Sequence, residues 1–174
     1  MQLRAWLAMA VLTLPLPGAA HADEKALLDP LIGEWNVGPP GGAAAFVERF
    51  SFGPERAYVW VAVALIRPAG DEHLHFEGLA AWNAATKRFD YLFAVEPGSG
   101  VQERGEFYAG DDGSIVRDVL LTAADGSTAV FRQTFRDLRD GRFETTLMRK
   151  TADGWAATFP GSERLVMVRR APIH

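Results

Sequence analysis

The side chains most capable of chemistry fall into two groups. Arg117, Gln133 and Thr145 each lie in a run that alternates with apolar and aromatic residues. The second group, His73-x-His75-x-Glu77, sits on a single run, and imidazole and carboxylate groups are common zinc ligands. Alternate residues of a strand point to opposite faces, so the facing of each strand decides which of these groups is enclosed.

Strand-like runs follow one another from Trp35 onward, and short clusters of turn-forming residues separate them. These clusters are Gly53-Pro54, 68–71, 83–86, 97–100, Asp111-Asp112-Gly113, 124–127, Arg139-Asp140-Gly141 and Ala152-Asp153-Gly154. No helical period is long enough for a parallel crossover. The sequence therefore predicts an all-β fold, an antiparallel up-and-down meander that closes into a barrel of roughly ten strands, since closure removes exposed edges.

The N-terminal residues predict export and then a single barrel domain. Arg4, the apolar run 5–16 and Ala20-His21-Ala22 form a signal peptide over 1–22, followed by a domain over 23–174. A short helix over 23–31, with Asp23 as its N-cap, is expected to plug one barrel end. We expect a periplasmic or secreted protein with no membrane span after cleavage.

Composition excludes several classes of function. The formal net charge of −4 argues against binding nucleic acid through bulk electrostatics. The absence of cysteine excludes disulfides, a cysteine nucleophile and a lipid anchor on cysteine. No Gly-x-Ser-x-Gly elbow and no phosphate-binding glycine loop is present.

Hairpin register indicates which face is enclosed. If Trp82 pairs with Lys87 across the turn 83–86, every pair on one face is apolar or aromatic, with Phe76 opposite Phe93. This facing sends His73, His75 and Glu77 to solvent, and alternate residues of one strand do not readily converge on a tetrahedral ion. We therefore expect neither a metal nor another cofactor.

The same facing, carried through the later hairpins, encloses a polar row within an aromatic interior. Arg117 is predicted to stand opposite Gln133, and Gln133 opposite Thr145, so that these three hold the polar end of a ligand. The ligand's apolar body would rest on Tyr91, Phe76, Phe93, Phe107 and Phe131. Alternatively, Arg117 pairs with a carboxylate such as Glu103, or it faces water. Glu103 and Arg149 are either further ligand contacts or an internal ion pair.

Gly33-x-Trp35 at the head of the meander, and the arginine-rich closing run 164–170, resemble the lipocalin-like, or calycin, barrels. The nearest resemblance is to bacterial exported lipocalin-like families of unknown function. It implies that Trp35 lies at the closed end and that Arg169 or Arg170 packs across its ring in a cation-π contact. The predicted strand number exceeds the eight of true lipocalins. Such a resemblance implies a fold and names no reaction.

Three functions follow from these patterns. The leading hypothesis is an exported protein that binds a small apolar or lipid-like molecule, including an anionic one, in the barrel lumen. The second is a packed barrel that serves as a structural or interaction module in the cell envelope. The third is an acid-base enzyme of isomerase or hydrolase type that uses Glu103 or the His73 and His75 pair.

Overall fold

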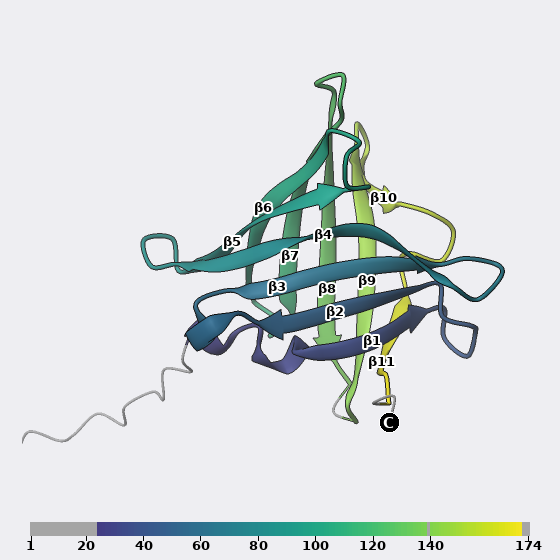
Figure 1. The fold of residues 1–174 in the computed structure, drawn as a ribbon, viewed down its shortest axis with the longest axis horizontal. Coiled ribbons are helices and arrows are strands. Elements are labelled where there is room, and N and C mark those ends of the chain that lie inside the picture. The colour runs from purple at the N-terminus through teal and green to yellow at the C-terminus, as the bar shows by residue number, and fades with distance from the viewer. Residues whose placement is uncertain (1–23, 139, 172–174) are drawn as a thin grey trace, which may run out of the picture.

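The computed structural model describes residues 24–138 and 140–171, which form strands connected by short loops (Figure 1). The predicted signal peptide and Asp23 lie outside the described residues. The strands are β1 (Gly33–Gly38), β2 (Phe46–Phe52), β3 (Val59–Ile66), β4 (Glu72–Asn83), β5 (Arg88–Val95), β6 (Val101–Ala109), β7 (Ile115–Thr122), β8 (Thr128–Asp137), β9 (Arg142–Thr151), β10 (Gly154–Ala157) and β11 (Leu165–Arg169).

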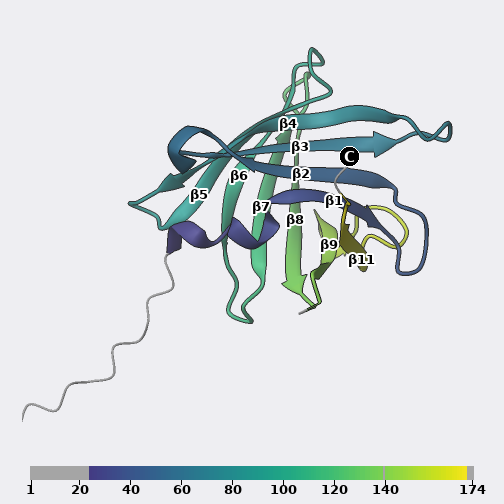
Figure 2. The same cartoon turned by 60° about the horizontal axis from the view of Figure 1, so that its bottom comes forward.

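Antiparallel pairing of neighbouring strands from β1 to β9 builds the meander that the turn clusters predict. β9 pairs with β8 along one edge. Along its other edge it pairs with β11 near its start and with β10 near its end. Pairing of β11 with β1 then closes the sheet into a ten-strand barrel, with β10 as an addition at the rim (Figures 1 and 2). The predicted closed all-β barrel is thus confirmed at this level.

The chain before β1 forms two short 3-10 turns, Glu24–Ala26 and Asp29–Leu31, at one end of the barrel (Figure 2). The single short helix expected over 23–31 is therefore not formed. Pro30 explains the interruption, because a proline disfavours the helical conformation of the preceding residue and cannot donate a backbone hydrogen bond. Leu28 and Leu31 are nevertheless fully buried, so the segment does cover the barrel interior at this end.

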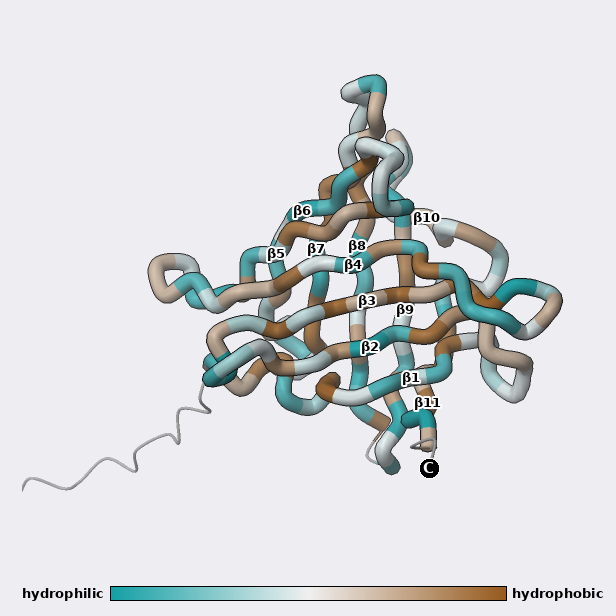
Figure 3. The backbone as a smooth tube through the Cα atoms, viewed as in Figure 1, coloured by the Kyte–Doolittle hydropathy of each residue, from teal (hydrophilic) through white to brown (hydrophobic). Residues whose placement is uncertain are grey.

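Hydrophobic and hydrophilic residues alternate along much of the strands (Figure 3). Because successive side chains of a strand point to opposite faces, this alternation separates the inside of the barrel from the outside. In the β4–β5 hairpin Trp82 pairs with Phe89 rather than with Lys87, so the predicted register is wrong by two residues. The turn starts one residue later than expected, because Asn83 stays paired with Arg88 while its side-chain oxygen accepts a hydrogen bond from the amide of Ala85. A shift of two preserves facing, and the predicted inner face is the buried one.

Trp35 organises the end of the barrel that the 3-10 turns cover. Its indole nitrogen donates to the Leu31 carbonyl at 2.6 Å, and its ring meets the Phe143 ring edge-on at 5.3 Å. Of the two candidate arginines, Arg169 lies over the indole ring at 4.5 Å. Arg170 instead forms an ion pair with Glu72 on the outer surface. We call this region the Trp35 end.

The backbone angle and the surroundings of Gly33 explain why glycine stands two residues before Trp35. Its φ of +135° is a backbone angle that residues with a side chain rarely adopt, and a Cβ added at this position would lie 2.4 Å from Nη1 of Arg169. The same Arg169 nitrogen donates to the Ile32 carbonyl at 3.1 Å. The missing side chain therefore makes room for the guanidinium that covers Trp35.

Candidate functional site

A cavity of about 220 Å³ occupies the lumen toward the end away from Trp35. Most of its wall is apolar, with Phe46, Val63, Leu65, Phe76, Val119, Leu121, Phe131, Leu147 and Phe159 contributing. The polar part of the wall consists of Glu48, His75, Glu103, Arg117, Gln133 and Thr158. A cavity that is largely apolar and carries a few convergent polar groups is typical of a small-molecule site.

Arg117 is the centre of a polar network that crosses the lumen. The register places it opposite Gln133, as predicted, and its Nη1 donates to Gln133 Oε1 at 3.0 Å. Its Nη2 donates to Glu103 on the adjoining strand β6. Gln133 Nε2 in turn donates to Glu48 Oε1 at 2.9 Å and to Thr145 Oγ1 at 3.4 Å. Strands β2, β6, β7, β8 and β9 thus meet through these five side chains.

Aromatic rings surround the Arg117 guanidinium. Its central carbon lies 5.0 Å from the ring centroids of Phe76, Tyr91 and Phe93, and 5.9 Å from that of Phe107. Cation-π attraction offsets part of the cost of burying this charge. Of these four rings, Phe76 lines the cavity, whereas the other three pack around the arginine. The aromatic surface predicted to carry a ligand is therefore largely occupied by Arg117 itself.

Some hydrogen-bonding capacity of the cavity wall is unused. Arg117 is only 5% exposed, and its Nε has no hydrogen-bond partner within the protein. The hydroxyl of Thr158 is likewise buried and unpartnered. Buried polar groups are nearly always paired, and leaving one unpaired costs about 1–3 kcal/mol. Both residues belong to the cavity wall.

The charges of the network are close to balanced. Arg117 and Glu103 form an ion pair whose side chains are 6% and 12% exposed. Burial raises the pKa of the Glu48 carboxyl, although the hydrogen bond from Gln133 and the charge of Arg117 oppose that shift. Burial also raises the pKa of Tyr91 to about 12, so this phenol remains a neutral donor to the Asp118 carbonyl at 3.0 Å. A raised carboxyl pKa favours the neutral form of Glu48.

Glu48 was missed by the sequence-based prediction, although the sequence carries a signal for it. Phe46, Glu48 and Phe50 alternate along β2, and aromatic neighbours two residues away on each side indicate an inward face. In the structure Glu48 pairs with the inward-facing Trp35 and is only 3% exposed.

His75 lines the cavity, contrary to the expectation that it points to solvent. Val63 pairs with Phe76 and Ala64 with Leu74, so His75 is the extra residue of a β-bulge. The extra residue of a bulge reverses which residues of the strand point inward beyond it. A sequence pattern of alternating residues does not show where this reversal occurs. His75 and the exposed His73 both contact Glu96, at 2.8 and 3.0 Å. No three histidine, aspartate or glutamate side chains among residues 24–138 and 140–171 form a metal-binding group.

Two further predicted residues lie outside the cavity. Thr145 is completely buried and pairs with Phe135 rather than with Gln133, so the predicted register of this hairpin is also shifted by two. Arg149 is exposed near the end of β9, next to β10, and does not pair with Glu103. Of the alternatives left open for Arg117, the structure shows the pair with Glu103.

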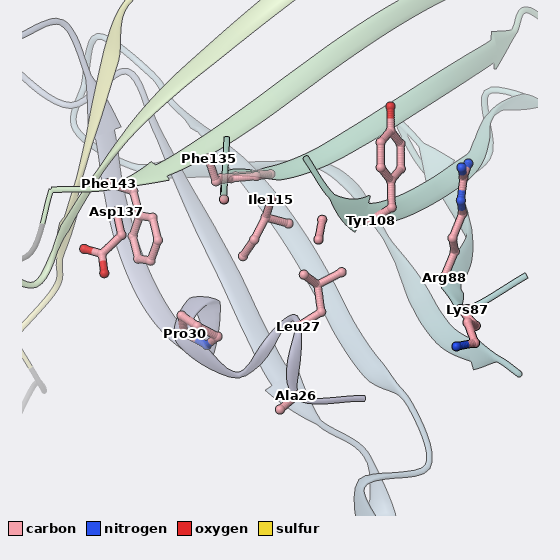
Figure 4. Close-up of a pocket in the computed structure, with 12 residues that line it drawn as sticks. Ala26, Leu27, Pro30, Lys87, Arg88, Tyr108, Ile115, Phe135, Asp137 and Phe143 are labelled. Carbon is pink, nitrogen blue, oxygen red and sulfur yellow. The ribbon is translucent and has the colours of Figure 1, made fainter. Parts of the chain in front are cut away.

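A second and larger hollow, of about 570 Å³, lies between the 3-10 turns and the strands at the Trp35 end. Figure 4 shows Leu27 and Pro30 on one side of it, with Ile115 facing them from the strands. Its charged members already have partners: Arg88 pairs with Glu106 and lies over the Tyr108 ring, and Lys87 and Asp137 also make interactions. Lys87 and Asp137 are exposed and Arg88 is half-buried, so these charges are not enclosed as that of Arg117 is.

Comparison of the chain with known protein families and with curated proteins gives no match. No helix in the part of the chain that the structure describes is long and apolar enough to cross a membrane. The feature of the described residues that most indicates a function is the Arg117 cavity.

Proposed function

We propose that this chain is an exported lipocalin-like barrel that binds one small, largely apolar molecule in its lumen. The polar end of the ligand lies against Arg117, Gln133 and Glu103, and its body rests on Phe76 and Phe131. The observation that carries this proposal is a buried charged network, with an unpartnered donor on Arg117, in the wall of an otherwise apolar cavity. The signal-like sequence of residues 1–22 supports a periplasmic or secreted location.

Cavity size restricts the ligand. Pockets for drug-sized molecules measure roughly 300–1,000 Å³, whereas an apolar cavity of about 150 Å³ accommodates benzene. The volume here, about 220 Å³, lies between these values. It favours a single ring or a short chain over a long lipid that is wholly enclosed.

A second candidate function is an interaction module of the cell envelope. Trp60, Leu79 and Leu92 lie in register on the outside of β3, β4 and β5 and are 39%, 41% and 54% exposed. Such a row favours contact with another macromolecule. The acid-base hypothesis has less support, because Arg117 engages Glu103 and Glu96 contacts both histidines.

Native mass spectrometry of the purified protein, with a library of single-ring and short-chain compounds, tests ligand binding. Leu121→Trp should fill the cavity and weaken binding by about tenfold or more, because Leu121 lines it. Leu120→Trp is the matched control, since Leu120 is the outward-facing neighbour on β7 and pairs with Val130. No retained compound, or equal retention by wild type and Leu121→Trp, contradicts the proposal.

A further inference from the structure

We propose that the lumen selects electrically neutral molecules whose polar end both accepts and donates hydrogen bonds, as a primary amide does, and that it rejects the corresponding carboxylates. This inference rests on the proposed function, namely that the cavity holds a ligand. It differs from the simplest expectation for a buried arginine, which is that the arginine binds an anion.

The charge of Arg117 is already compensated within the protein. Its Nη2 donates to the carboxylate of Glu103, and both side chains are largely buried. An entering anion would compete with Glu103 for the same cation, and like charges repel strongly when they are removed from water. It would also have to lose its own hydration. The arginine therefore offers a carboxylate little net attraction.

Glu48 places a second carboxyl group on the same wall. It is 3% exposed and is joined to Arg117 through Gln133, which donates to it and accepts from the arginine. With Glu48 neutral, Arg117 and Glu103 leave the network with no net charge. With Glu48 ionised, the network is negative. Neither state attracts an anion.

The remaining hydrogen-bonding groups match a ligand end that is both an acceptor and a donor. Arg117 Nε–H and the Thr158 hydroxyl are donors without partners. The Glu103 carboxylate has about four acceptor positions and can accept further hydrogen bonds, and Glu48 keeps acceptor capacity whether or not it is protonated. An amide presents a carbonyl oxygen to the first kind of group and an N–H to the second.

A cationic ligand is disfavoured for a separate reason. Positive groups in apolar cavities are usually stabilised by aromatic faces. Here the rings of Phe76, Tyr91 and Phe93 are each 5.0 Å from the Arg117 guanidinium. The arginine thus already occupies the position that a cation would take.

Benzamide, benzoate and benzamidinium form a test series, because they share one ring and nearly one shape but differ in charge. Their ring suits a cavity of about 220 Å³. We expect calorimetry at neutral pH to show that wild type binds benzamide about tenfold or more tightly than either charged compound. Benzoate binding as tight as that of benzamide would overturn the proposed selectivity while leaving the binding function intact.

Glu103→Gln sharpens the test by releasing the charge of Arg117. In this variant benzoate should bind about tenfold or more tightly than it binds to wild type, and the order of benzamide and benzoate should reverse. Glu106→Gln is the matched control, because Glu106 lies on the same strand but pairs with Arg88 outside the lumen. Unchanged benzoate affinity in a folded Glu103→Gln protein overturns the inference.

Binding of benzamide, benzoate and benzamidinium to wild type tests the selectivity for neutral ligands even if Glu103→Gln fails to fold. Should none of the three compounds bind, the selectivity proposal is overturned in this form. The library experiment with Leu121→Trp then decides separately whether the lumen binds any ligand.

Discussion

Arg169 and Arg117 both lie close to aromatic rings, but their surroundings are opposite. Arg169 covers the Trp35 ring from an exposed position and donates to a backbone carbonyl. Arg117 is buried among four rings, bound to Glu103 and Gln133, with one nitrogen unpartnered. An exposed cation loses little hydration, whereas a buried one loses much of it. The contact at the Trp35 end therefore forms at little cost in hydration, whereas burial of the Arg117 network is costly.

The largest expected loss of stability comes from the Trp35 end. Trp35→Ala should lower the free energy of unfolding by about 3–5 kcal/mol, because the side chain is 1% exposed and packs against Phe143. Urea unfolding followed by circular dichroism measures this loss. Trp155→Ala, at a residue that is 38% exposed on β10, should cost less than about 1 kcal/mol. Similar losses for the two variants would contradict the assignment of Trp35 as the packed centre of its end.

At the Arg117 region, single and double substitutions should differ. Arg117→Met should destabilise the protein by about 3 kcal/mol, because Glu103 and Glu48 lose their compensating charge. Replacing both members of the pair, in Glu103→Met with Arg117→Met, should bring stability back to within about 1 kcal/mol of wild type or above it. Urea unfolding of the three proteins checks the difference. A double variant no more stable than the single one would mean that the pair supports the fold.

The smallest of these effects should appear in the pH dependence of Glu48→Gln. Burial raises the pKa of the Glu48 carboxyl above its ordinary value of 4.5, so the folded protein binds this proton more tightly than the unfolded chain does. The resulting stabilisation is fully present below about pH 4.5. The contribution is lost as the pH rises through the folded-state pKa. The stability of Glu48→Gln relative to wild type should therefore increase as the pH rises above about 4.5.

Urea unfolding at several pH values tests this expectation, with Glu77→Gln as the control because Glu77 pairs with Ala62 and Ala94 on the outer face of β4. A difference between wild type and Glu48→Gln that does not change with pH would argue that the carboxyl of Glu48 is not perturbed by burial.

The strands and their facing could be predicted from the sequence because turn residues and alternation report directly on both. In two hairpins the predicted register differs from the structure by two residues, at Trp82 and at Thr145, yet facing survived because the side-chain period of a strand is two. Arg117 and Gln133 could be found for the same reason. The bulge at His75 could not, since one unpaired residue leaves no mark on the local pattern. Arg149 was predicted to face the lumen but is exposed near the end of β9. Alternation gives the face of a strand on which a residue lies, but not whether the strand at that point still encloses the lumen.

Closure of the barrel joins residues that are far apart in the chain. Trp35 in the first strand pairs with Arg169 in the last, and β11 covers only the first part of the free edge of β9. Without β11, the sheet is therefore not closed, and β1 and the first part of β9 each have an unpaired edge. Pairing of segments so far apart in the chain costs loop-closure entropy, so we expect this closure to slow the folding of the barrel.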